Sequence, residues 1–182
     1  TTDPWLDPGS AALSPEGRRV AYTVGNSSHR SASGLYVTRI DGSGTENLLA
    51  GAHGLTAVRA PAGSPHGRRP AFVGLDHRTA WDLWTIRADG TGLTRVTRCG
   101  CAWENTPRWS PVRDELLWSP RTYDLAVLDL RTGQSTTLYD HAPSGAMNVL
   151  SYGWSPDGSR GVFSGSRWNE SAVGVHTVAR EG

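Results

Sequence analysis

The chain contains no lysine: all 18 positive side chains among its 182 residues are arginine, set against 17 acidic residues. The formal net charge is therefore +1, and no basic stripe stands out. This balance argues against a nucleic-acid-binding protein, because phosphate contacts need a positive surface. Arginine in place of lysine is typical of a GC-rich genome, and it leaves the surface free of amine nucleophiles.

Long apolar runs and helical patterns are also missing. No apolar run approaches the roughly 18 residues of a membrane span, so we expect no membrane insertion. No stretch keeps a 3.6-residue apolar period over the ten or so residues that a helix needs. The chain shows neither an initiator methionine nor a signal peptide, so we expect a mature form or an excised piece.

Cysteine is scarce, and its two copies, Cys99 and Cys101, stand on either side of one glycine. Three interpretations stay open: two free loop thiols, a strained and reducible disulfide across Gly100, or part of a soft-metal site with a nearby histidine. The pair alone supplies too few ligands for zinc, which takes about four. We expect no metal and no cofactor.

Catalytic motifs are absent as well. The chain has no G-x-S-x-G nucleophile elbow and no HExxH pair. Ser28 and His29 are neighbours in sequence, which does not make a triad. No catalytic residue is therefore predicted, and a binding role is favoured over an enzymatic one.

An internal repeat is the strongest feature that is present. A turn beginning with Ser-Pro occurs four times, with its prolines spaced 50, 46 and 45 residues apart. The four copies are "LSPEGRRVAY" from Leu13, "GSPHGRRPAF" from Gly63, "WSPVRDELLW" from Trp109 and "WSPDGSRGVF" from Trp154. A second block follows each turn: "LYVTRIDGSG" from Leu35, "LWTIRADGTG" from Leu83, "LAVLDLRTGQ" from Leu125 and "VGVHTVAREG" from Val173. Two blocks recurring in the same order indicate four copies of one structural unit.

The turn chemistry predicts β-hairpins. Proline presets φ for the first central position of a turn, and a later glycine supplies a positive φ. Gly17, Gly67 and Gly158 can take this role, whereas Arg113 stands in the third turn and predicts a different shape there. The flanking runs are short and rich in Val, Tyr, Phe, Leu and Trp, which is typical of strands buried between neighbouring sheets.

A unit of this length with four short strands fits a propeller blade. The pattern "WSPDG…(V/L)xF…(I/L)YVxxxDGSG…LT" resembles the TolB-like, WD-type β-propeller repeat, and prolyl oligopeptidase-type propeller domains use a similar one. The resemblance implies an all-β fold: one β-propeller domain over residues 1–182, with about four blades at 10–50, 58–98, 105–140 and 150–182. TolB-type propellers have more blades, typically six.

Each blade is expected to run from an inner strand before the Ser-Pro turn to an outer strand after the Asp-Gly turn. The fourth copy stops after its third strand, so we expect the last blade to be incomplete. The N-terminal "TTDPWLDPG" could replace only the end of the missing strand. Because unpaired strand edges invite pairing, a homodimer with two copies sharing about eight blades is predicted as the alternative.

The strand order divides the connections between two ends of the sheets. The Ser-Pro and Asp-Gly turns lie at one end, which we call the turn face and interpret as structural. Loops between second and third strands, and loops joining blades, lie at the other end, the loop face, where we place function. Its candidate residues for a protein, peptide or glycan partner are Trp81, Trp103, Trp168, Tyr123, Arg78, Arg121, Arg167, His53, His77 and His141. The alternative is that these loops are solvated connections.

We therefore predict a non-enzymatic binding or scaffold module. The resemblance to TolB implies protein partners in a bacterial envelope or extracellular setting. The alternative function is the substrate-gating propeller of a prolyl oligopeptidase-like serine hydrolase whose catalytic domain lies outside this chain. A small metalloenzyme using the histidines of the loop face is a third possibility.

Overall fold

The computed structural model describes residues 7–25, 34–50, 54–77, 80–100, 106–121, 123–141, 147–167 and 173–181. These residues form strands, turns and bends, and no helix occurs among them. The strands build four antiparallel sheets, each a meander in which consecutive strands pair. The all-β prediction is thus confirmed. The part of the chain that the structure describes holds no helix that could cross a membrane.

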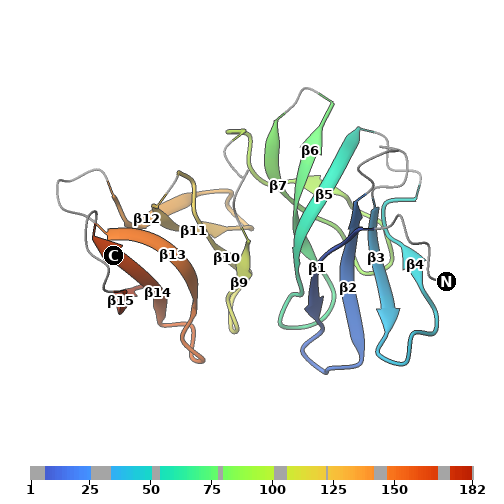
Figure 1. The fold of residues 1–182 in the computed structure, drawn as a ribbon, viewed down its shortest axis with the longest axis horizontal. Coiled ribbons are helices and arrows are strands. Elements are labelled where there is room, and N and C mark those ends of the chain that lie inside the picture. Colours follow the sequence, from blue (N-terminus) through green and yellow to red (C-terminus); the bar gives the residue numbers. More distant parts are fainter. Residues whose placement is uncertain are drawn as a thin grey trace. The chain divides into compact units, whose positions relative to one another are not determined.

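The chain forms two compact units, Thr1–Pro107 and Arg108–Gly182, which we call unit 1 and unit 2. Unit 1 contains two four-stranded sheets, drawn from blue to green in Figure 1. The strands of the first sheet are β1 (Asp7–Leu13), β2 (Arg19–Gly25), β3 (Gly34–Arg39) and β4 (Glu46–Asn47). Those of the second are β5 (Leu55–Ala62), β6 (Ala71–Asp76), β7 (Trp81–Thr85) and β8 (Thr94–Arg95).

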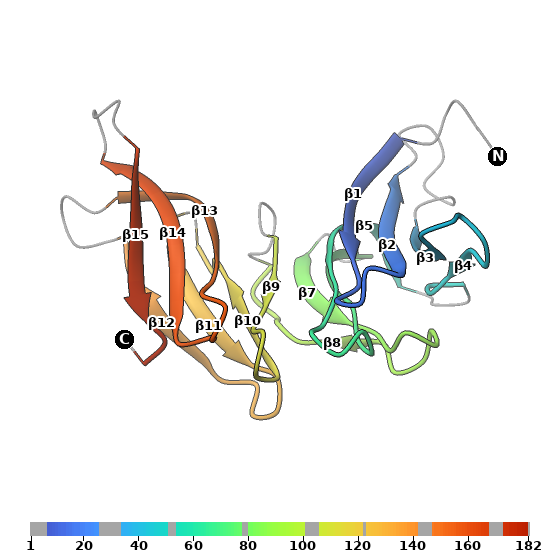
Figure 2. The ribbon, with the colours of Figure 1, turned by 90° about the horizontal axis from the view of Figure 1, so that it is seen from below.

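Unit 2 contains one four-stranded and one three-stranded sheet, seen from a second direction in Figure 2. The first has β9 (Arg108–Trp109), β10 (Glu115–Trp118), β11 (Leu125–Asp129) and β12 (Ser135–Tyr139). The second has β13 (Met147–Trp154), β14 (Arg160–Arg167) and β15 (Gly174–Ala179). The described residues supply no fourth strand beside β15, as the shortened last copy predicts.

The N-terminal segment does not patch this edge with its described residues. Asp7 and Pro8 pair with Gly25 and Val24 of β2 and so belong to the first sheet. Thr1 and Thr2, which the sequence comparison places at the end of the missing strand, lie outside the described residues.

The Ser-Pro turns close through the serine itself. Ser14 Oγ accepts the N–H of Arg19 at 3.0 Å, and Ser155 Oγ accepts the N–H of Arg160 at 3.0 Å. The predicted glycines have positive φ, for example 67° at Gly17. In the third turn the N–H of Arg113 donates instead to Ser110 Oγ at 3.2 Å, and Arg113 has no positive φ. The different shape predicted for that turn is confirmed.

Carboxylates in the turns accept local hydrogen bonds that stabilise their charged form. The hydroxyl of Ser155, with the N–H and hydroxyl of Ser159, lowers the pKa of Asp157 from 3.8 to about 2. The Ser43 hydroxyl and N–H lower the pKa of Asp41 in the same way. These aspartates act as Asx-turn residues, which explains why Asp precedes Gly in the repeat.

Each unit has its own apolar core between its two sheets. In unit 1, residues of both sheets form one buried cluster: Leu35, Leu48, Val58, Phe72 and Ile86. In unit 2 the corresponding cluster is Leu117, Leu125, Val127, Leu138, Val149 and Phe163. Successive side chains of a strand point to opposite sheet faces, so alternate residues of these strands pack into the cores.

Strand pairing corrects the alignment of the fourth copy. Phe163 pairs with His176, just as Phe72 pairs with Trp84 in the second sheet. His176 therefore takes the place of Trp84 and not, as the sequence alignment predicts, that of Ile86. It is half-buried, and its ring lies 5.4 Å from that of Phe163. The alignment is wrong by two residues because a shift of two keeps the same face of the strand.

Candidate functional sites at the loop face

Five of the ten predicted site residues have described side chains: Trp81, Tyr123, Arg121, His77 and His141. Four others lie outside the described residues: His53, Arg78, Trp103 and Trp168. Arg167 ends β14, and only its backbone is described. The structure places the five described residues in two separate groups, one in each unit.

In unit 1 the group is built around Trp81, the first residue of β7. The guanidinium carbon of Arg59 lies 4.1 Å from the centroid of the Trp81 ring. This is the geometry of a cation–π contact, which contributes about 0.5–1 kcal/mol at exposed sites and more where water is excluded. Trp81 and Arg59 are both half-buried, and the Nη2 atom of Arg59 is buried.

A bulge in β5 positions Arg59. The pairing of β5 with β6 shifts between Arg59 and Ala62, and Ala60 has a φ of 50°. The N–H of Ala60 donates to Ser10 Oγ on β1 at 2.7 Å, which holds this bulge. Sequence reasoning missed Arg59. The available signal is that it is the one charged residue in the otherwise apolar segment "LTAVRAPA".

Asp82, next to Trp81, anchors the loop that follows β8. Its side chain is fully buried, and its Oδ1 accepts the Thr97 hydroxyl at 2.8 Å and the N–H of Cys99 at 3.0 Å. The Arg95 guanidinium donates to Asp82 and also to Asp76, the latter at 2.8 Å. Cys99 is disulfide-bonded. Cys101, the partner expected from the sequence, lies outside the described residues.

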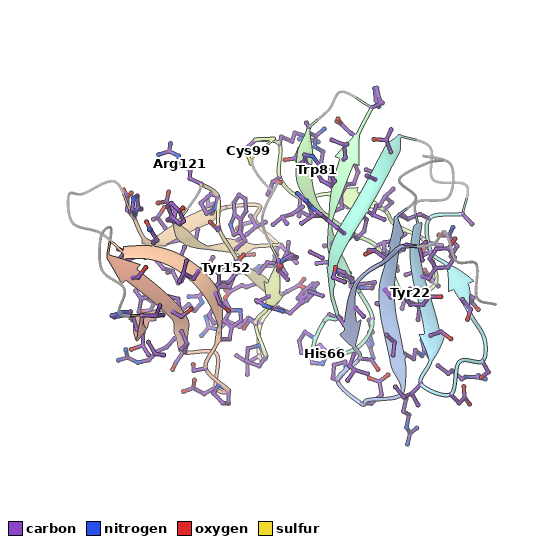
Figure 3. All side chains as sticks on the ribbon, viewed as in Figure 1. Tyr22, His66, Trp81, Cys99, Arg121 and Tyr152 are labelled. Carbon is purple, nitrogen blue, oxygen red and sulfur yellow. The ribbon has the colours of Figure 1, made fainter. Side chains whose placement is uncertain are left out.

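His77 stands at the same end of unit 1 but is exposed. Its N–H donates to the carbonyl of Gly54 at 3.2 Å, so its backbone joins the β6–β7 loop to the start of β5. Figure 3 shows Trp81 and Cys99 at the loop face of unit 1, with His66 at the opposite end.

In unit 2 the group is built around Tyr123. Its φ is 74°, a left-handed conformation that bulky residues rarely adopt. The Tyr123 and His141 rings lie 5.3 Å apart and are tilted by 54°. Arg121 is exposed, and its carbonyl accepts the N–H of Asp124 at 3.1 Å. The structure thus brings Tyr123 and His141 together, as sequence reasoning alone could not show.

The two groups share a local motif, an aromatic residue followed by Asp and Leu. It reads Trp81-Asp82-Leu83 in unit 1 and Tyr123-Asp124-Leu125 in unit 2. Both leucines are fully buried, and both aspartates accept N–H groups of the following interblade loop; Asp124 accepts that of His141 at 2.9 Å. The aspartates therefore hold the loops, while the aromatic rings form the surface. Sequence reasoning missed both aspartates.

The chemistry of these groups is that of recognition. They contain aromatic faces, a guanidinium and imidazole rings, which suit stacking and hydrogen bonding. No group of three or more His, Cys, Asp or Glu side chains suited to a metal ion occurs among the described residues.

The comparisons with known proteins bear on the fold. No protein-family model matches the chain, and no curated protein matches it. Among solved structures, TolB from Acinetobacter baumannii is 18% identical, with a TM-score of 0.68 over 94% of this chain and 41% of that one. The putative TolB from Agrobacterium tumefaciens is 21% identical, with a TM-score of 0.61 over 98% of this chain and 60% of that one.

The chain has a TolB-like β-propeller fold. Its four sheets are blades of this type, and the last one is three-stranded in its described residues. A nidogen/laminin complex also matches, at 17% identity and a TM-score of 0.67, over 93% of this chain and 59% of that one. The chain spans less than two thirds of the length of each of these proteins.

Proposed function

We propose that the chain is a non-enzymatic binding module that holds a protein, peptide or glycan partner at its loop face. The observation that carries this proposal is the conformation of Tyr123. A left-handed φ at a non-glycine residue costs of the order of 1 kcal/mol or more, and such residues cluster at functional sites. Glycine or asparagine would fit the turn at lower cost, so the tyrosine ring beside His141 has a use other than folding.

The Arg59–Trp81 pair supports the same proposal from unit 1. Tryptophan, tyrosine and arginine are the residue types that dominate the binding energy of protein interfaces. A half-buried ring that already has a rigid neighbour loses little side-chain entropy on binding. The remaining predicted residues stay proposed candidates for partner contacts: His53, His77, Arg78, Trp103, Arg121, Arg167 and Trp168.

Among protein, peptide and glycan partners, we propose a protein first. The nidogen structure among the matches was solved in complex with laminin, and fold similarity makes such a role accessible to this chain. The TolB-like fold further supports an extracellular or cell-envelope location in a bacterium, with all residues 1–182 acting as one propeller domain.

The test is capture of a partner from an envelope extract of the source organism by the immobilised chain. We expect Trp81→Ala and Tyr123→Ala each to reduce the captured partner at least about tenfold, because they remove anchors. Val112→Ala is the matched control, since Val112 is an exposed apolar residue of a Ser-Pro turn on unit 2. If the wild type and all variants capture equal amounts of the partner, the loop face is not the binding site.

A second copy of the chain is proposed as the partner of the β15 edge. In the described residues β15 pairs with β14 alone, and Val175 on it is 76% exposed. We expect light scattering to give a dimer, twice the 19.5 kDa of one chain, and expect Val175→Pro to shift it toward monomer because proline removes an edge N–H donor. A wild-type monomer at all concentrations contradicts this proposal.

The gating propeller of a serine hydrolase is the second candidate. Puromycin hydrolase matches at 19% identity and a TM-score of 0.60, over 94% of this chain and 27% of that one. A G-x-S-x-G motif in the same reading frame would favour this candidate over the binding module.

A further inference from the structure

The turn face of unit 1 contains a shallow hollow of about 560 Å³. Three turns line it: the Ser-Pro turns of both blades and the Arg87–Gly90 turn that follows β7. Its charged side chains are Glu16, Arg19, His66, Arg68, Arg87 and Asp89. Figure 3 shows His66 at this end of the sheets, opposite to Trp81, so the hollow is separate from the loop face.

The two Ser-Pro turns touch at this hollow. A Cβ atom at Gly67 would lie only 3.2 Å from Glu16 Oε2, so the first turn lies directly against the second. The N–H of Arg68 donates to Ser64 Oγ at 3.1 Å, which holds the second turn in place. The arginines thus stand on a rigid base.

Turn formation does not require these arginines. The place of Arg68 in the repeat is taken by Asp114 in the third turn and by Ser159 in the fourth. The place of Arg19 is taken by Glu115 in the third turn. There the N–H of Ser110 donates to the carbonyl of Glu115 at 2.9 Å, as the N–H of Ser14 donates to the carbonyl of Arg19 in the first turn. The third turn thus forms with acidic residues at both places, whereas the fourth turn keeps an arginine, Arg160, at the place of Arg19.

The acidic groups of the hollow are engaged within their own turns. Asp89 accepts the hydroxyl and N–H of Thr91 at 2.7 and 2.9 Å, and these bonds lower its pKa. Hydrogen bonding to its own backbone is the main cause that lowers the pKa of Glu16. Neither carboxylate lies within ion-pair distance of the Arg19 or Arg68 guanidinium. All three arginines are exposed, and Arg87 Nη1 donates to the Thr91 hydroxyl at 3.4 Å. The positive charge of Arg19 also helps to lower the pKa of Glu16, and that of Arg87 helps to lower the pKa of Asp89.

We propose that this hollow binds an acidic peptide segment through its carboxylates. The planar guanidinium forms paired hydrogen bonds with a carboxylate, and three arginines on three separate turns suit several carboxylates along one extended chain. The net charge of +1 disfavours a nucleic acid as the ligand, because contacts to a phosphate backbone need an extended positive surface.

The test uses a fluorescein-labelled octaglutamate peptide and the full chain, with binding followed by fluorescence anisotropy. We expect Arg68→Glu and Arg19→Glu each to weaken binding at least about tenfold, and added salt to weaken binding to the wild type. Arg131→Glu is the control, because it makes the same charge change on unit 2 at a side chain that is 84% exposed. It should change the affinity less than about twofold.

The proposal is overturned if octaglutamate does not bind, or if octaglutamine binds equally well. It is also overturned if Arg131→Glu weakens binding as much as Arg68→Glu, because general charge would then explain the result. Tighter binding of single-stranded DNA or anionic vesicles than of octaglutamate contradicts the choice of ligand. Circular dichroism checks that each variant is folded. Arg87→Gln is a third variant, which removes one positive charge without adding a negative one and so should weaken binding less than Arg68→Glu.

Discussion

Replacing Asp82 by alanine is expected to destabilise unit 1 by about 3–5 kcal/mol, the usual cost of removing one partner of a buried ion pair. Asp82 is fully buried, and the side chain of Arg95, its partner, is only 23% exposed. The change leaves Asp76 as the one carboxylate among the described residues that pairs with Arg95, and it removes the acceptor for the N–H groups of Cys99 and Gly100. The cost therefore combines an undercompensated charge with unpaired donors.

Urea denaturation followed by tryptophan fluorescence measures this effect. Asp41→Ala is the control, because Asp41 accepts similar hydrogen bonds from Ser43 in an exposed turn. It should cost much less than Asp82→Ala, because its hydrogen bonds are made in a solvent-exposed turn. Asp82→Ala with Arg95→Ala is not expected to recover the loss, because the buried carboxylate of Asp76 then loses the Arg95 guanidinium. A cost for Asp82→Ala no larger than that for Asp41→Ala would show that the network does not stabilise the fold.

Replacing Glu115 by alanine is expected to destabilise unit 2 by about 3 kcal/mol for the same reason. Glu115 is 4% exposed, and the Nε and Nη2 atoms of Arg180 donate to its two oxygens. The hydrogen bond to Glu115 is the main cause that raises the pKa of Arg180. Arg180 follows β15 and Glu115 begins β10, so this pair ties the two blades of unit 2 together.

A double-mutant cycle of Glu115→Ala and Arg180→Ala measures the coupling. We expect an interaction free energy of about 1–3 kcal/mol, in the range of residues that share one network. Arg131→Ala is the control: Arg131 and Asp129 are 3.9 Å apart, with the arginine side chain 84% exposed, and such surface pairs contribute about 0–1 kcal/mol. Additive effects of the two substitutions would mean that the bidentate contact does not hold the blades.

Much of the fold could be predicted because its signals are local. Each Ser-Pro or Asp-Gly turn and each apolar run of strand length spans only a few residues. Their fourfold recurrence then identifies them as parts of one repeated unit. The order of strands in each sheet agrees with that prediction, as do the three strands that the described residues form in the last blade.

The candidate sites could be predicted only in part. Trp81, Tyr123 and His141 could be predicted because they are aromatic or imidazole residues in segments that the strand order places at the loop face. The side chains that hold and complete the sites do not stand out, because Asp82 and Asp124 look like ordinary polar residues at the start of a strand. The hollow on the turn face was missed because the sequence interpretation treated that face as structural.

The sequence by itself determined the number of blades, their strand order and the turns between strands, since each depends on residues close together in the chain. Only the tertiary structure decided that Arg59 lies over Trp81, that Tyr123 contacts His141, and that Glu115 binds Arg180. These contacts depend on a bulge, on a left-handed residue and on the packing of one sheet against another. Residues 65 positions apart, such as Glu115 and Arg180, meet only when whole blades have packed.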